Sequence, residues 1–410
     1  MREPEIRPHE SRRARRTTHE ARGDGAHERR TLDTLDEDTS DAPQKCDDEL
    51  HLRDLPATVV LGALCLLLFL ITLGLALGAA DDPLAVLLTS LWSLSDETGA
   101  LRQLGALDVT RLWLDGEWWR LGTAALLHGS WLHLLLNLSA LWSVGGWLEK
   151  ALGGARAMLV FALSSLAASL ASASWCEAPL VVGASGGIMG MAGALWFVRR
   201  HGPRALRARV EAVSATNLAV MVALCLGLGL VVPVIAQAGH LGGLVLGTVT
   251  AVALVGRTRT LRALAALAAL LLLTTGAFLA RDPTWRANRH LFVAMRHLAD
   301  GSPIIALASF EKALELRPGD PNLENAVAYH LALAGESLDR AEVLVRRALE
   351  ADPDNPDFLD TMGWIECRRG RPAEGLPWLE RARNLSTPLP PEIGEHLATC
   401  HDAQVRPASD

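Results

Sequence analysis

The sequence predicts an all-α protein in two parts, a polytopic membrane helical bundle followed by a C-terminal array of helical hairpins. Half of the 410 residues are hydrophobic and the mean hydropathy is positive, unlike an ordinary soluble enzyme. The apolar residues gather between positions 57 and 280, whereas both flanks are rich in Arg, Glu, Asp and Pro. Beyond Arg281 the pattern changes to amphipathic helices separated by proline-containing breaks.

Residues 1–56 form a polar, mixed-charge segment that we predict to be a disordered tail. Its "SRRARR" run is no export signal, because the first apolar segment begins about forty residues later and is too long. The net charge of −7 averages unlike regions, and no basic stripe suggests nucleic acid. Six cysteines without a CxxC pair or regular spacing predict free thiols, with no disulfide framework and no metal site. We expect no cofactor.

Seven apolar runs approach the ~20 residues that a helix needs to cross a bilayer. Each is predicted to be a helix, because a lone strand cannot satisfy its backbone hydrogen bonds in lipid. The runs are 57–79, 124–147, 155–174, 182–199, 213–232, 236–255 and 263–280. The first six form a core at 57–256. The last run is short and lies in a separate region, 257–281.

Basic residues in the connecting loops set the expected orientation. The most basic short loop, residues 199–209, is predicted to be cytoplasmic by the positive-inside rule. Two further basic clusters, two crossings before and after it, fall on the same side: Lys150 with Arg156, and Arg257 with Arg259 and Arg262. The N-terminal tail is then cytoplasmic, and residues 80–123 form an outer loop. That loop holds "RLWLDGEWWRLG", whose tryptophans favour the headgroup region of a bilayer.

The sequence beyond residue 286 repeats itself. The strings "FEKALELRPGDP" and "VRRALEADPDNP" begin 35 positions apart, at Phe310 and Val345, and "LERARNLSTP" follows 34 positions later at Leu379. This period resembles that of tetratricopeptide repeats (TPR), over residues 287–388 and about three repeats. Each unit is a helical hairpin that buries its apolar face by stacking on a neighbour. We therefore expect a short α-solenoid, followed by a C-terminal tail at 389–410.

Polar side chains within the membrane block are costly, so each is a functional candidate. Ser185 lies in "VVGASGGIMGMAGALW", His240 in "AGHLGGLVLG", and "HGSWLHLLLN" carries His128, His133 and Asn137. The helices that carry them should all run from outside to inside, which puts these side chains in one layer near the outer surface. His133 and Asn137 share one helix face because they are four residues apart.

Taken singly, these residues have ordinary explanations. A serine between Gly183 and Gly186 is most often a packing residue, and a membrane histidine can be a hydrogen-bonding residue or part of a proton relay. Glycines at three- and four-residue intervals near Ser185 and His240 fit close packing of two helices. Such packing would bring the two side chains together. A histidine can then take the serine proton and return it to a leaving amine, while nearby donors stabilise the oxyanion.

This ordered set resembles the rhomboid intramembrane serine proteases, over about residues 57–256. The motifs that carry the resemblance are "GASGG", "AGHLGGLVLG", "HGSWLHLLLN" and "EWWR". It implies a six-helix bundle with a water-filled cavity open to the outside and a Ser–His dyad without an acidic third member. Ser185 would be the nucleophile and His240 the general base and then acid.

The resemblance also assigns the neighbouring residues. It implies that the oxyanion is held by the Ser185 backbone N–H together with His133 and Asn137, and that supporting positions are His128, Gly183, Gly186 and Met189. Family members usually carry an aromatic residue at the position of Met189, four residues after the serine. A thioether can still contact an imidazole ring, although with less restriction on its shape.

The implied function is hydrolysis of peptide bonds near the outer ends of transmembrane segments of membrane proteins, in a bacterial plasma membrane. The partners are the lipid bilayer, transmembrane substrates and a protein bound by the repeats, which would lie outside. One alternative is a catalytically silent rhomboid-like protein that binds membrane clients, although it would not require Ser185, His240, His133 and Asn137. Another is a transporter or proton relay, which would call for more intramembrane carboxylates than the sequence contains.

Overall fold

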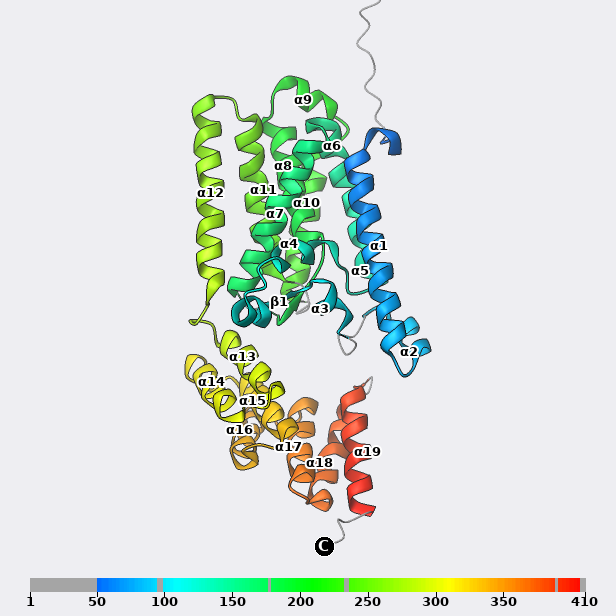
Figure 1. Ribbon diagram of the computed structural model, residues 1–410, viewed down its shortest axis with the longest axis vertical. Coiled ribbons are helices and arrows are strands. Elements are labelled where there is room, and N and C mark those ends of the chain that lie inside the picture. Colours follow the sequence, from blue (N-terminus) through cyan, green and yellow to red (C-terminus); the bar gives the residue numbers. More distant parts are fainter. Residues whose placement is uncertain (1–49, 94–98, 176–177, 232–235, 388–389, 406–410) are drawn as a thin grey trace, which may run out of the picture. The chain divides into compact units, whose positions relative to one another are not determined.

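The computed structural model describes residues 50–93, 99–175, 178–231, 236–387 and 390–405 (Figure 1). The predicted N-terminal tail up to residue 49 therefore lies outside the described residues, as do Cys46 and Cys176. Helices dominate the described part. The strands found there, β1 (Leu107–Asp108) and β2 (Leu180–Val181), pair in the antiparallel sense.

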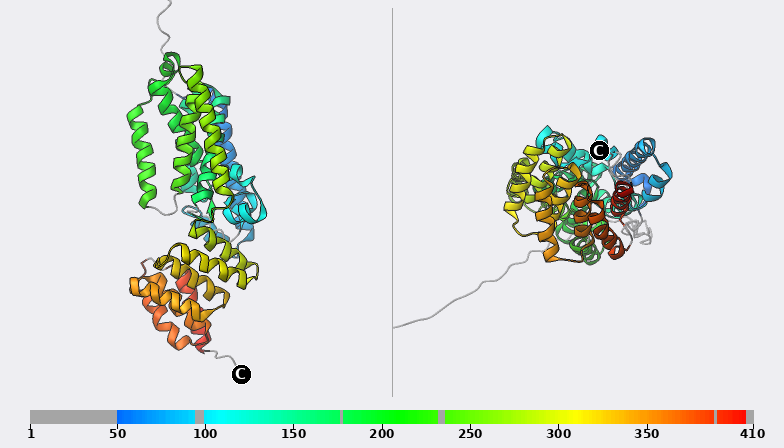
Figure 2. Two further views of the ribbon diagram at one scale, coloured as in Figure 1. Left: turned by 90° about the vertical axis from the view of Figure 1, so that its left-hand side faces the viewer. Right: turned by 90° about the horizontal axis from the view of Figure 1, so that it is seen from below.

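The long helices of the membrane block run side by side in a bundle (Figures 1 and 2). The α-helices of this block are α1 (Pro56–Ala79), α2 (Pro83–Thr89), α3 (Ala100–Leu104), α4 (Arg120–Thr123), α5 (Trp131–Ala140), α6 (Gly146–Leu152), α7 (Gly154–Trp175), α8 (Ser185–His201), α9 (Arg204–Arg209), α10 (Ala215–Val231), α11 (Gln237–Val255) and α12 (Arg259–Arg281). Short 3₁₀ and π turns join them at η1 (Leu52–Asp54), η3 (Arg111–Asp115), η4 (Ala124–Leu126) and η5 (Leu141–Gly145).

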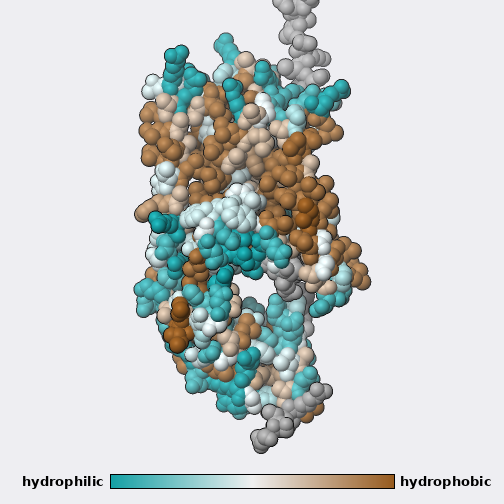
Figure 3. Space-filling view, in the orientation of Figure 1, coloured by the Kyte–Doolittle hydropathy of each residue, from teal (hydrophilic) through white to brown (hydrophobic). Residues whose placement is uncertain are grey.

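Four helices of the described chain, α1, α7, α11 and α12, are long and apolar enough to cross a membrane. The segments 120–126 and 131–152 add one more crossing if they are taken together as a single bent span. The predicted runs at 182–199 and 213–232 correspond to shorter helices of 17 residues each, α8 and α10. Figure 3 shows the resulting band of hydrophobic side chains between hydrophilic ends on the face in view. The chain is therefore a multi-pass membrane protein.

The predicted helix at 124–147 is wrong in its first part. The chain makes a 3₁₀ turn at η4, becomes extended at Leu127, and starts α5 only at Trp131. The two apolar segments on either side of this break meet at 90°. Ser130 is the reason for the new start, because its Oγ accepts a hydrogen bond from the His133 N–H at 3.1 Å and caps the helix. His128 therefore lies in the break and not in a helix.

Helices α7, α8 and α11 pack closely through small residues. A Cβ on Gly243 would meet the Gly186 backbone, and one on Gly247 would meet the Gly190 backbone. Ala168 of α7 occupies the space beside Gly186. The backbones of α8 and α11 therefore approach as only glycine allows, which is the packing that the sequence predicts for these two helices.

The end of the bundle away from Ser185 is held by a buried carboxylate. Glu149 of α6 accepts hydrogen bonds from the backbone N–H groups of Ala57 (3.0 Å) and Thr58 (2.8 Å) and from the Thr58 hydroxyl (2.7 Å). These N–H groups belong to the first turn of α1, where they have no partner within the helix. Glu149 thereby satisfies the start of α1 and fixes it against α6.

Beyond α12 the described residues form seven further helices. They are α13 (Ala287–Ala299), α14 (Pro303–Leu316), α15 (Pro321–Ala334), α16 (Leu338–Ala351), α17 (Pro356–Arg368), α18 (Pro372–Leu385) and α19 (Pro391–Val405). The first six form three helical hairpins, with a proline in the first turn of α14, α15, α17 and α18. Proline fits this position because it lacks an N–H that would be unpaired there.

Helix α16 differs from these four, because its first turn begins with Leu338 and Asp339. Here Ser337 precedes the helix at a positive φ of 46°, after Gly335 ends α15 at 70°. These two left-handed backbone positions let the chain turn from α15 into α16 and close the hairpin.

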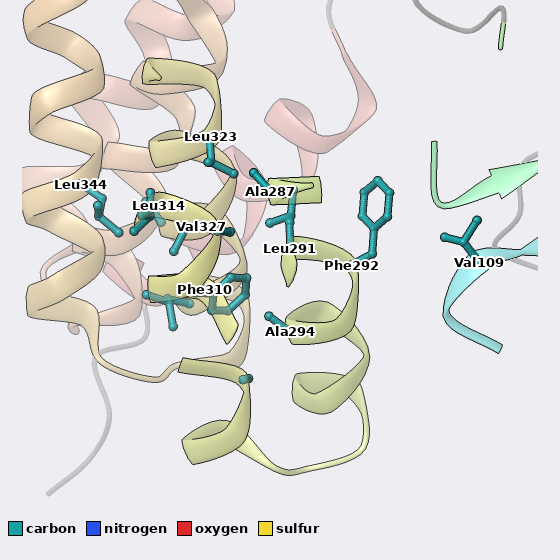
Figure 4. Close-up of a cluster of buried hydrophobic side chains, with 14 of the residues drawn as sticks. Val109, Ala287, Leu291, Phe292, Ala294, Phe310, Leu314, Leu323, Val327 and Leu344 are labelled. Carbon is teal, nitrogen blue, oxygen red and sulfur yellow. The ribbon is translucent and has the colours of Figure 1, made fainter. Parts of the chain in front are cut away.

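The hairpins bury the residues that set the repeat period. Phe310, Val345 and Leu379 are fully buried, each on the second helix of its hairpin. Figure 4 shows Phe310, Leu314, Val327 and Leu344 gathered between neighbouring helices. Gly363 and Gly375 face each other across α17 and α18, since a Cβ on either would come close to the other's carbonyl oxygen.

Two expectations for the C-terminal part are corrected. The segment 389–410 is not merely a tail, because residues 391–405 form α19, which buries Ile393 and Leu397 against the third hairpin. Cys367 and Cys400 are not free thiols, because they form a disulfide between α17 and α19 with their Cα atoms 5.6 Å apart. A spacing of 33 residues gives no signal of its own; helix packing brings the two cysteines together.

Candidate active site

Ser185 is the first residue of α8, and the segment before it is held in place by the small sheet. Strand β2 pairs with β1, and the Gly183 N–H donates to the Ala124 carbonyl at 2.9 Å. Gly183 has a φ of +127°, a conformation that other residues rarely adopt. The chain can therefore turn sharply from an extended strand into α8 and present the Ser185 side chain at the turn.

His240, in the first turn of α11, meets Ser185 directly. Its Nε2 lies 2.8 Å from the Ser185 Oγ, a hydrogen-bonding distance. Both side chains are partly exposed. In the described part of the chain the His240 Nδ1 is buried and has no hydrogen-bond partner, so no carboxylate is seen to orient the ring. The arrangement is a hydroxyl–imidazole pair without an acidic third residue.

His133 lies beside this pair. A Cβ placed on Gly183 would be 2.8 Å from the His133 Nε2 and 3.7 Å from the Ser185 Oγ. The imidazole edge of His133 and the hydroxyl of Ser185 therefore converge over Gly183. Asn137 is buried one turn further along α5, where its Nδ2 donates to the His133 carbonyl at 2.8 Å. An amide carries two N–H donors, so this bond leaves one of them for another acceptor.

His128 is fully buried behind His133. The two rings meet edge to face, with centroids 5.0 Å apart and planes at 62°. Among the described residues, His128 makes no hydrogen bond to Ser185 or His240, and its ring contact is with His133. Of the other predicted positions, Gly186 packs against Ala168, and Met189 is buried one turn after Ser185.

The outer loop is organised by buried charge. Arg120 is 2% exposed, and its Nη1 donates to the carbonyls of Arg102 at 2.7 Å and Ala106 at 3.0 Å, while its Nε pairs with Glu117. Glu117 and Arg120 are the first and last residues of the "EWWR" motif. The arginine therefore ties this motif to the segment that leads into β1.

Asp108 is a second organising residue of this loop, and the sequence reasoning missed it. Burial raises the pKa of its carboxyl, but hydrogen bonds from Thr110 and the Arg111 backbone, with the charge of Arg102, together hold that pKa below its ordinary value. Ser130 was missed as well. Its position just before an apolar run is a capping signal that could have located the start of α5.

Trp113 differs from its expected role as an interfacial anchor. Its indole Nε1 donates to the Ala280 carbonyl at the end of α12 at 3.0 Å, and Arg289 of α13 lies over its ring. Nearby, Arg296 of α13 pairs with Asp115 at 3.6 Å, and Val109 belongs to the same buried cluster as Phe292 (Figure 4). The outer loop thus contacts the first repeat helix. Trp118 and Trp119 remain exposed.

The fold and the site together define a class: a multi-pass helical membrane protein with a serine and a histidine paired near one end of the bundle. Among the described residues, no group of three or more His, Cys, Asp or Glu side chains is arranged to hold a metal ion.

Known proteins identify the family that this class resembles. Residues 115–257 match the model of the rhomboid domain. The chain is 37% identical over 160 residues to the rhomboid protease GluP of Bacillus subtilis, which covers 39% of this chain and 30% of that protein. It is 30% identical over 167 residues to the rhomboid protease AarA of Providencia stuartii, covering 36% and 59% of the two chains.

A third relative is the rhomboid protease GlpG of Pectobacterium atrosepticum, which is 33% identical over 136 residues, 32% of this chain and 47% of that protein. This chain thus spans between 30% and 59% of the lengths of these three relatives. Over its membrane block the chain is therefore similar to the rhomboid family.

Proposed function

We propose that this protein is an intramembrane serine endopeptidase that cleaves membrane proteins within or near the outer ends of their transmembrane segments. The observation that carries the proposal is the 2.8 Å contact between the Ser185 Oγ and the His240 Nε2, in a bundle that matches the rhomboid domain. The partial exposure of both side chains supports it, because water and an unwound peptide must reach them.

In the proposed reaction the Ser185 Oγ attacks the scissile carbonyl carbon while the His240 Nε2 takes the hydroxyl proton. The imidazolium then gives this proton to the leaving amine, which leaves an acyl enzyme on Ser185. Water attacks the acyl carbon, again with His240 as the base, and releases the carboxylic acid and the free serine. No third residue is needed to balance these proton transfers.

The oxyanion of each tetrahedral intermediate would be held by the Ser185 backbone N–H, His133 and Asn137. The convergence of His133 and Ser185 over Gly183 supports the first two donors. The free N–H of the Asn137 amide supports the third. Removing one such donor typically costs ~3–4 kcal/mol of transition-state stabilisation in a dry site. His128 would act through His133 as a positioning residue, and Met189 would take the place of the family's aromatic residue.

The helices after residue 286 would form a TPR-like scaffold on the outer side, where they recruit substrate ectodomains or a partner protein. Their period, their hairpins and the burial of Phe310 and Val345 support the likeness to tetratricopeptide repeats. Arginines at the other end of the bundle and the Cys367–Cys400 disulfide support the outer location, since disulfides persist in oxidising compartments. Added protease should therefore digest the repeats of intact cells; protection of the repeats would contradict this topology.

A fluorophosphonate probe tests the nucleophile. Labelling of the purified chain should require Ser185 and should be lost in Ser185→Ala, while Ser169→Ala, which removes a buried hydroxyl of α7 elsewhere in the bundle, should label normally. Labelling of Ser185→Ala at the wild-type level would exclude Ser185 and would favour the catalytically silent, client-binding alternative.

A further inference from the structure

A polar cavity of about 500 Å³ lies at the end of α8 away from Ser185. Arg199 and Arg200 line it from the last turn of α8, Arg207 lines it from α9, and residues 211–216 complete it at the start of α10. Glu211 is the acidic residue of the lining, so the cavity carries an excess of two positive charges. Figure 1 shows α9 at this end of the bundle, and Figure 3 shows the end to be hydrophilic.

The arginines of this cavity are arranged differently from those of the outer loop, which all pair with carboxylates. Arg199 is fixed to the wall, because its Nε donates to the Val213 carbonyl at 2.9 Å. Within the described residues, the guanidinium groups of Arg200 and Arg207 have no hydrogen-bond or ion-pair partner, and the Arg207 Nε is buried. The N–H donors of these two guanidinium groups are therefore available to a ligand.

The start of α10 adds further donors to the same cavity. Ser214, Ala215 and Thr216 are among its lining residues, and the Ser214 hydroxyl accepts the Asn217 N–H at 3.2 Å. The first N–H groups of a helix have no partner within it, and the positive end of its dipole favours an anion. The 17-residue helix α10 thus begins beside the guanidinium groups of Arg199, Arg200 and Arg207.

We propose that this cavity binds the phosphate group of an anionic phospholipid. Planar guanidinium groups bind phosphate oxygens through paired N–H donors, and basic pockets between membrane helices suit acidic headgroups. Val220 and Leu224, further along α10, are exposed apolar side chains that give an acyl chain a surface to follow. Free phosphate offers the same oxygen atoms to the arginines, but it has no acyl chain that could lie along Val220 and Leu224.

Native mass spectrometry of the purified full-length chain in detergent tests this proposal. Three probes are added separately: phosphatidylglycerol, phosphatidylcholine and inorganic phosphate. The test variant is Arg200→Gln with Arg207→Gln. Its matched control is Arg204→Gln, which removes an exposed arginine of α9 that does not line the cavity. A second double variant, Arg200→Lys with Arg207→Lys, keeps both positive charges. It shows whether weaker binding by the glutamine pair comes from the lost charge or from damage to the fold.

The wild-type chain and Arg204→Gln should retain phosphatidylglycerol in preference to phosphatidylcholine. The glutamine pair should bind it more weakly, by roughly fivefold to tenfold for each arginine removed. The lysine pair should retain more lipid than the glutamine pair. Equal retention by wild type, the glutamine pair and Arg204→Gln would overturn the proposal. A phosphate adduct without a preference for phosphatidylglycerol would assign the cavity to free phosphate and overturn the lipid.

Discussion

Gly183 is the residue at which backbone conformation and site geometry meet. Its φ of +127° suits glycine, and an added Cβ would collide with the His133 ring. We predict that Gly183→Ala lowers kcat/KM by roughly 10²-fold or more, because a small displacement of Ser185 or His133 ruins the alignment of reacting groups. The backbone strain should cost only ~1–3 kcal/mol of stability.

The matched control for this change is Gly116→Ala in the outer loop. Gly116 also has a positive φ, of 69°, but a Cβ there would meet nothing within 4 Å. Gly116→Ala should therefore show the backbone strain of a positive φ without a collision with a neighbouring side chain. Cleavage by Gly183→Ala at the rate of Gly116→Ala would mean that the crowding over Gly183 has no bearing on the site.

The approach of Ser185 to His240 could be predicted from the sequence, whereas the finer contacts of the candidate site could not. Ser185, His240, His133 and Asn137 stand out because polar side chains are rare in apolar helices. The hydrogen bond of Asn137 to the His133 carbonyl depends on a rotamer, and the role of Asp108 depends on burial in a loop. Neither leaves a periodic signal in the sequence.

Helices α8 and α11 owe their close approach to pairs of glycines. We predict that Gly247→Ala destabilises the protein by ~1–3 kcal/mol, because its new methyl group would overlap the Gly190 backbone. Thermal unfolding in detergent measures the effect. Gly78→Ala in α1 is the control, since a Cβ there meets nothing within 4 Å and alanine favours helix. Equal melting temperatures for the two variants would contradict this account of the interface.

At the scale of elements, apolar length predicts most of the long helices but not their interruptions. The run at 124–147 is continuous in hydropathy, yet the chain bends by 90° within it. The bend follows from capping by Ser130 and from the pairing of the Gly183 N–H with Ala124, which are local and tertiary hydrogen bonds. Hydropathy averages over such bonds, so it cannot place them.

The molecule as a whole contains a disulfide, Cys367–Cys400, that the number and spacing of its cysteines do not predict. We predict that Cys367 and Cys400 resist alkylation in intact cells until a reductant is added, because they form the disulfide that fixes α19. Cys225→Ser, which removes a free thiol of α10, should leave this pattern unchanged. Replacing both bridge cysteines by serine should cost the repeats ~3–4 kcal/mol for a closed loop of this length. Alkylation of Cys400 without reductant would contradict the bond.

The central claim is that Ser185 is the nucleophile of an intramembrane endopeptidase, and cleavage of a single-pass reporter tests it most directly. The full-length chain and its Ser185→Ala variant are each placed in vesicles with the reporter, and the cleaved fragment is quantified over time. We predict cleavage near the outer end of the reporter's transmembrane segment by the wild-type chain and a complete loss in Ser185→Ala. Cleavage by Ser185→Ala at the wild-type rate would contradict it.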